Sequence, residues 1–133
     1  MKIKTVSDLM WYVAEVPMNQ RNVSDFDVDG ITVFHVTTAE NAAAIRKNGF
    51  KAQNSRQSYD RPDAVYFFAD SSDINAANLS LLGINQDAEV ITVRIPISEF
   101  ANNTKWDGLY NATFNTSYSA IQYLANVPAT WIV

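Results

Sequence analysis

The sequence predicts a single α+β domain. Its 133 residues are the length of one domain. Capped, helix-length segments lie early in the chain, and strand-length apolar runs fill the second half. This order differs from the regular alternation of strand and helix that predicts a parallel α/β sheet. With 47% hydrophobic residues, such a domain has enough apolar side chains for a core without disulfides.

Caps and apolar spacing predict the helices. The segment from Ser7 to Val16 is amphipathic, with Ser7 as a candidate N-cap. Thr38 is the candidate N-cap of a second helix, which Gly49 ends. Phe50 then packs back onto the core. Further helical segments are predicted from Asp70 or Ser71 to about Leu82, and as a turn or single helical turn within 97–103.

Apolar runs and turn residues predict the strands. The predicted strands are 31–36, 64–69, 89–96, 109–113, 119–124 and 130–133. Residues 64–69 are mostly apolar, which is typical of a central strand. Residues 89–96 alternate, so Ile91, Val93 and Ile95 face the core. Residues 18–30 are polar and are expected to form an exposed connection.

Composition excludes several classes of function. The chain has no cysteine, which removes disulfides, thiolate metal sites and a cysteine nucleophile. One histidine and scattered acids do not build a usual zinc site. A net charge of −4 without a basic run disfavours nucleic acid as the main partner. No apolar run approaches the roughly 20 residues of a membrane span, and residues 1–8 have no apolar signal-peptide core. With the absence of cysteine, this predicts a cytoplasmic protein, or one delivered into or expressed in a host cell.

Four short motifs occur in an order that suggests a function. They are Phe34-His35-Val36-Thr37-Thr38, then Asn48-Gly49-Phe50 after a short helix, then Val65-Tyr66-Phe67, and finally Val127-Pro128-Ala129-Thr130-Trp131-Ile132. Over residues 31–133 this order resembles the ADP-ribosyltransferase superfamily of the His-Tyr-Glu type. The resemblance implies two small sheets, antiparallel or mixed, split around a cleft for NAD, with short helices in the N-terminal half. Residues 1–30 would form an N-terminal helix and connection in the same single domain.

The resemblance also implies roles for particular residues. His35 would hydrogen-bond the adenosine ribose of NAD, with Thr37 beside it. Tyr66 would stack on the nicotinamide ring. Arg56 and Arg61, in the polar loop that follows Phe50, would meet the pyrophosphate. Without the resemblance, His35 and Tyr66 are ordinary packing residues, and the two arginines are solvated loop residues. NAD is then the substrate, and no metal is implied.

This sequence lacks the third element of the family's pattern, a glutamate. The resemblance requires a glutamate on a late strand, where it stabilises the charge that develops on ribose. The chain has only Glu15, Glu40, Glu89 and Glu99, and no acidic residue follows Asp107. Gln122 is the best match to the missing position, and with Tyr66 it is the candidate catalytic residue. An uncharged residue there predicts a large loss of rate.

Two functions follow, from different classes. One is an NAD-dependent mono-ADP-ribosyltransferase that modifies a protein or a small acceptor, as a toxin, an effector or an anti-defence factor of phage type would. The other is a catalytically degenerate member of the fold that binds and inhibits a protein. A related RNA 2′-phosphotransferase is disfavoured because that branch uses more than one histidine. A triad of Ser55 or Ser58 with His35 and Asp60 stays open as an alternative.

Overall fold

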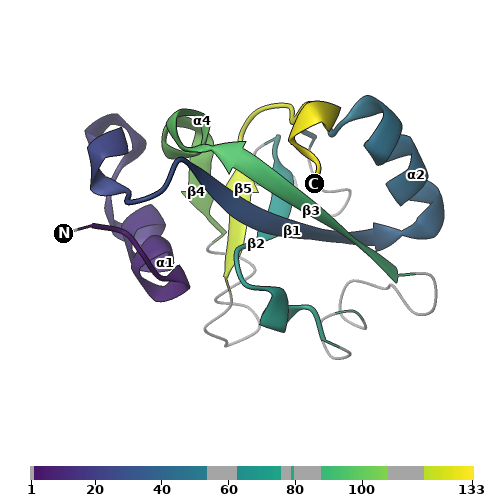
Figure 1. Ribbon diagram of the computed structural model, residues 1–133, viewed down its shortest axis with the longest axis horizontal. Coiled ribbons are helices and arrows are strands. Elements are labelled where there is room, and N and C mark those ends of the chain that lie inside the picture. Colours follow the sequence, from purple (N-terminus) through teal and green to yellow (C-terminus); the bar gives the residue numbers. More distant parts are fainter. Residues whose placement is uncertain (1, 54–62, 76–78, 80–87, 108–118) are drawn as a thin grey trace.

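Five strands form one open antiparallel sheet in the order β3-β1-β2-β5-β4 (Figure 1). The computed structural model describes residues 2–53, 63–75, 79, 88–107 and 119–133. The strands are β1 (Gly30–Thr38), β2 (Val65–Phe68), β3 (Ala88–Pro96), β4 (Thr104–Trp106) and β5 (Ala120–Tyr123). The α+β class is therefore confirmed. The predicted pair of small sheets is wrong, because β1 and β2 join both halves into one sheet.

The junction between β1 and β2 is the weakest in the sheet. β1 pairs with β3 along its whole length, with Gly30 opposite Pro96 and Thr38 opposite Ala88. With β2 it pairs only where Phe34 lies opposite Phe68. Among the described residues no further pairing of β1 with β2 follows, and β1 continues toward helix α2 (Ala39–Asn48).

One face of the sheet carries the core. The register places alternate residues of each strand on this face, and buried Ile91, Val93 and Ile95 confirm the alternation predicted for 89–96. Buried residues of this face are Val33, Val65, Phe67, Ile91, Val93, Ile95, Ile121 and Tyr123. Helix α4 (Ile97–Asn103) packs here through the fully buried ring of Phe100. The predicted single turn at 97–103 is thus an α-helix of 7 residues.

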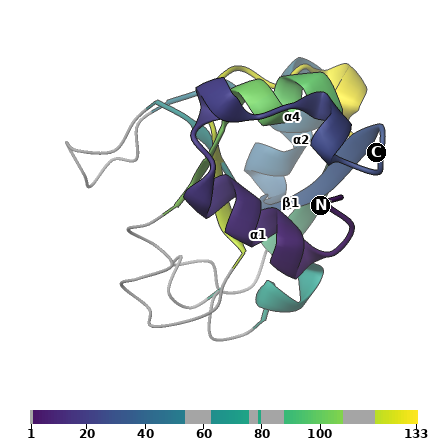
Figure 2. The ribbon, with the colours of Figure 1, turned by 90° about the vertical axis from the view of Figure 1, so that its left-hand side faces the viewer.

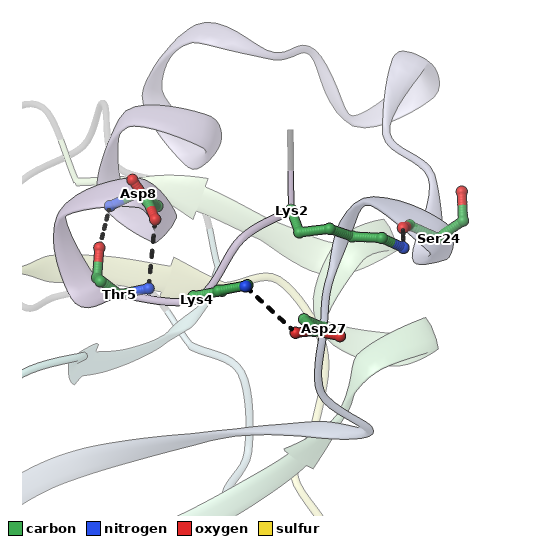
Figure 3. A network of polar contacts seen from close by, with 6 residues as sticks. All are labelled: Lys2, Lys4, Thr5, Asp8, Ser24 and Asp27. Atoms are coloured by element: carbon green, nitrogen blue, oxygen red, sulfur yellow. Dashed lines mark hydrogen bonds and ion pairs between the residues drawn. The ribbon is translucent and has the colours of Figure 1, made fainter.

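Helices α1 and α2 lie at opposite ends of the long axis (Figure 1), and Figure 2 looks along that axis with α1 in front. Helix α1 (Val6–Glu15) confirms the first predicted helix, but Thr5 rather than Ser7 is its N-cap. Thr5 Oγ1 accepts from the Asp8 amide, and an Asp8 carboxylate oxygen accepts from the Thr5 amide (Figure 3). Lys4 pairs with Asp27 at 3.9 Å.

Residues 18–30 are more ordered than their polar composition predicts. They contain the 3₁₀ turns η1 (Met18–Gln20) and η2 (Val23–Asp25). Phe26 is buried, and its ring lies edge-on to Tyr12 at 5.0 Å between ring centroids. The prediction of an exposed connection is therefore wrong for Phe26, because one aromatic residue among acids gives no periodic signal.

Arg21 links this N-terminal region to α4 and to strand β4 by hydrogen bonds. Its guanidinium donates to the carbonyls of Val13, Val16, Ala101 and Thr104. These carbonyls lie at or near the C-terminal ends of α1 and α4, where unpaired acceptors and the helix dipole favour a cation. Burial lowers the pKa of Arg21, but an arginine stays charged at neutral pH.

Helix α2 confirms the prediction in detail. Thr38 Oγ1 accepts from the Asn41 amide, and Gly49 follows the last helical residue with φ of 78°. A Cβ on Gly49 would lie 2.4 Å from the Val127 carbonyl oxygen. Only glycine suits both the backbone conformation and the contact. The turn directs Phe50 into the core, where it is 6% exposed, as predicted.

The end of the chain differs from its prediction. Residues 130–133 are not a strand, because the segment begins within the 3₁₀ turn η4 (Ala129–Trp131). Ile132 still bridges to Val93, and the Val133 amide donates to the Thr92 carbonyl, so the segment covers part of the β3 edge. Strand β4 was not predicted, since 3 residues show no alternation.

The segment after β2 differs from the predicted helix, because a 3₁₀ turn stands at its start and Ile74 and Asn75 are not helical. Asp70 accepts from the Ser72 amide and caps the 3₁₀ turn η3 (Ser71–Asp73). An Asp73 carboxylate oxygen accepts from the amide and the hydroxyl of Ser119 and so ties the turn to the start of β5. Residues 76–78 and 80–82 of the predicted helix, and the predicted strand 109–113, lie outside the described residues. No helix within the described ranges is long and apolar enough to cross a membrane.

Replacing Gly49 with alanine should destabilise the fold. A side chain at this φ costs about 2 kcal/mol, and its clash with Val127 adds to that cost. Denaturant unfolding of Gly49→Ala measures the loss. Asn48→Ala is the matched control, since Asn48 is exposed and its change should stay within about 0.5 kcal/mol. Equal stability of the two variants would contradict the role given to Gly49.

Candidate functional site

A pocket of about 460 Å³ opens where β1 and β2 separate, beside helix α2. We call it the α2 pocket. Its wall consists of the end of β1, residues 41, 44 and 45 of α2, the segment from Gly49 to Gln53, and residues 64–66 at the start of β2. The volume is within the range of small-molecule sites, which runs from about 300 to 1,000 Å³.

The far wall of the α2 pocket is held by backbone hydrogen bonds. Phe50 and Val127 exchange two, at 2.8 and 3.0 Å. The Ala52 amide donates to the side chain of Asn126, and Gln53 pairs with Ala64. The turn at Gly49 starts this segment along the pocket, so its course is fixed by local sequence and by the C-terminal region together.

His35 is fixed in one orientation. Its Nδ1 lies 2.7 Å from the carbonyl oxygen of Tyr66. The ring stands edge-on to Phe50 and Phe67, with centroids 4.9 and 5.9 Å away. A carbonyl only accepts hydrogen bonds, so Nδ1 must carry the proton.

The same hydrogen bond determines what His35 offers to a ligand. Burial lowers the pKa of His35, and the bond to the Tyr66 carbonyl opposes that shift in part. The ring is therefore neutral at physiological pH, and Nε2 carries a lone pair. Within the described part of the chain, no group hydrogen-bonds Nε2. His35 thus presents an acceptor, which suits a ligand hydroxyl.

Three of the residues implied by the resemblance line the α2 pocket, namely His35, Thr37 and Tyr66. Thr37 is 7% exposed and lies two residues beyond His35 on the same face of β1. Tyr66 comes from the opposing strand. Because Ala64, Val65 and Tyr66 are consecutive, both faces of β2 contribute to the pocket at this end.

Gln122 lies beside Tyr66 but outside the described lining of the pocket. It sits on β5, opposite Tyr66 on one side and Lys105 on the other, and is 6% exposed. The register gives Tyr66 and Gln122 one face of the sheet and His35 and Thr37 the other. The candidate residues therefore lie in two pairs on opposite faces of the sheet, and of these four Gln122 alone is outside the described pocket lining.

The remaining candidates lie outside the described residues. These are Arg56 and Arg61, and the serines and aspartate of the alternative triad, Ser55, Ser58 and Asp60. Among the side chains that are described, no three histidine, aspartate or glutamate residues gather where they could hold a metal ion.

Sequence reasoning missed three polar residues of the pocket wall: Asn41, Lys51 and Gln53. Asn41 lies in the first turn of α2, directly after the strand that carries His35. Lys51 and Gln53 follow the glycine turn. Their proximity to Gly49 was the available signal, because the turn returns the chain to the sheet.

Comparison with protein-family models, with curated proteins and with solved structures found no match. The assignment of function consequently depends on the residues of the α2 pocket and on the motif order.

The stability of the protein should decrease in acid partly through His35. Its folded pKa lies below the ordinary 6.5, so the unfolded chain takes up this proton first as pH falls. Stability is lost from near pH 6.5 downward until the folded ring also protonates. His35→Asn keeps a donor near the Nδ1 position but does not titrate, so its unfolding free energy should fall less between about pH 7.5 and pH 5.

The chain has a single histidine, so its imidazole nitrogens can be followed by NMR without assignment ambiguity. The spectrum should show the Nδ1–H tautomer and a pKa below 6.5. An Nε2–H tautomer, or equal acid sensitivity of wild type and His35→Asn, would contradict the described environment.

Proposed function

We propose that the protein binds NAD in the α2 pocket and transfers its ADP-ribose to a protein or small acceptor. The observation that carries this proposal is the neutral His35, whose Nε2 accepts while Nδ1 is held by the Tyr66 carbonyl. Ribose hydroxyls are the hydrogen-bond donors that such a group recognises. The order of the four motifs supports the same reading.

In this proposal the ligand lies across the gap between β1 and β2. The adenosine ribose donates to His35 Nε2, and Thr37 offers a second hydroxyl contact. The nicotinamide ring stacks on Tyr66, which brings the adjoining ribose toward Gln122 on the same face. The separation of the residues into two pairs matches a ligand with two nucleoside halves.

The reaction breaks the bond between the nicotinamide nitrogen and ribose C1. Nicotinamide leaves as a neutral molecule with the bonding electrons, and positive charge develops on the ribose. An acceptor nucleophile then bonds to C1 and loses its proton to solvent or base. Gln122 can hydrogen-bond a ribose hydroxyl but carries no charge to stabilise this state. We therefore expect slow turnover, by orders of magnitude relative to a carboxylate at that position.

Loss of the Nε2 acceptor should weaken NAD binding. In His35→Asn the amide group can still donate to Tyr66, but no atom replaces Nε2. We expect NAD affinity and nicotinamide release to fall on the order of tenfold, as for one hydrogen bond. Calorimetry with NAD, and release of labelled nicotinamide, measure the two effects. Ser98→Ala, an exposed change on α4, should alter neither.

The identity of Gln122 should limit the rate. Gln122→Glu places a carboxylate beside Tyr66 and opposite Lys105, whose charge offsets part of the cost of burial. Nicotinamide release should then rise at least tenfold, on the order expected for a charge aimed at the transition state. Gln53→Glu adds the same charge on the α2 pocket wall and should not raise the rate. A folded Gln122→Glu protein without any gain would remove Gln122 from catalysis.

A second candidate, a catalytically degenerate domain that inhibits a protein, is favoured by one observation. The described lining of the α2 pocket contains no carboxylate. If NAD binds but neither wild type nor Gln122→Glu releases nicotinamide, this candidate replaces the transferase. His35→Asn would then leave binding of the protein target unchanged.

A further inference from the structure

Lys51 is the one charged side chain in the described lining of the α2 pocket. It is exposed, and among the described residues nothing pairs with its ammonium. Two arginines beside the sheet, in contrast, are already paired with carboxylates. Arg46 lies 3.6 Å from Glu89, and Arg94 lies 2.7 Å from Asp29. Lys51 is thus a cation at the pocket wall whose charge is available to a ligand.

The backbone around Lys51 is pinned on both sides. Before it, Phe50 exchanges hydrogen bonds with Val127. After it, the Ala52 amide donates to the Asn126 side chain at 2.9 Å, and Gln53 pairs with Ala64. The flexible part is therefore the four-carbon side chain alone. An ammonium on a fixed base can follow an anion over a short range without reorganising the pocket.

The charges of the pocket favour an anionic group. His35 is neutral, the described lining has no carboxylate, and the net charge of the chain is −4. A cation at this wall is therefore a local exception in an acidic protein. Its attraction for an anion is stronger beside the low-dielectric pocket wall than in open water.

We propose that Lys51 binds the diphosphate of the ligand, so that the α2 pocket selects nucleosides that carry a diphosphate over free nucleosides. This inference rests on the proposed binding of NAD and adds the group that recognises its charged centre. The resemblance gave this role to Arg56 and Arg61, whereas Lys51 is placed on the pocket wall by the Gly49 turn.

The experiment measures the affinities of four probes, which are adenosine, ADP, ADP-ribose and NAD. The proteins are wild type, Lys51→Gln, Lys51→Arg and Lys47→Gln. Lys47 is the matched control, because it is an exposed cation in the last turn of α2 and does not line the pocket. All variants change exposed side chains, and their unfolding curves verify the fold.

We expect Lys51→Gln to bind ADP, ADP-ribose and NAD on the order of tenfold more weakly, as for one charge-assisted contact. Its affinity for adenosine should stay unchanged, Lys51→Arg should retain most of the diphosphate affinity, and Lys47→Gln should match wild type. Rising salt should reduce the difference between wild type and Lys51→Gln.

Three results would overturn the inference. The first is that Lys51→Gln equals wild type for every probe, and the second is that it loses adenosine affinity equally. The third is that Lys47→Gln matches it, which would reveal a long-range effect of net charge. If wild type binds NAD in these cases, the proposed binding of NAD stands and the role of Lys51 alone is wrong. If wild type binds none of the four probes, the proposed function and the role of Lys51 are both wrong.

Discussion

The hydrogen bond between His35 Nδ1 and the Tyr66 carbonyl holds the two halves of the sheet at the site. The backbone ladder between β1 and β2 ends after Phe34 and Phe68, so a side chain continues the link that main-chain groups do not make. This arrangement leaves a gap wide enough for a pocket while keeping its two walls in a fixed relation. It also sets the tautomer of the ring. This one hydrogen bond therefore holds the two walls of the α2 pocket together and makes Nε2 the nitrogen that accepts.

The elements that sequence predicted well are those whose signals are local. Helix α2 has its cap at Thr38 and its stop at Gly49, both within the segment. The alternation of β3 follows from one buried face. The number of sheets was predicted wrongly because it depends on a single pair between Phe34 and Phe68. These residues are 34 positions apart, and no local pattern in the sequence indicates that they pair. The 3₁₀ turn at Ala129–Trp131 was missed for a related reason, since its apolar residues serve as packing against β3 and not as a ladder.

The residues of the candidate site that lie within local motifs were predicted, and those placed by the fold were not. His35, Thr37 and Tyr66 belong to motifs with a fixed order, and they line one pocket. Lys51 has no motif, and its place on the wall results from the left-handed turn at Gly49 and the pairing of Phe50 with Val127. The position of Gln122 relative to the pocket depends on strand pairing across β2 and β5, which spacing along the chain does not give. Local motifs therefore predicted three residues of one pocket, whereas sheet topology decided which other groups lie beside them.

The α2 pocket combines two features that together narrow its ligand. A neutral imidazole nitrogen at His35 accepts a hydrogen bond and offers no charge to a phosphate. Lys51, on the wall of the same pocket, attracts an anion and cannot accept a hydrogen bond. The proposed ligand satisfies both, because a nucleoside diphosphate carries a hydroxyl and a diphosphate along one molecule. In the proposed reaction, β1 and the turn after α2 bind these two groups. Tyr66 on β2 and Gln122 on β5 share the other face of the sheet, where the proposed reaction takes place.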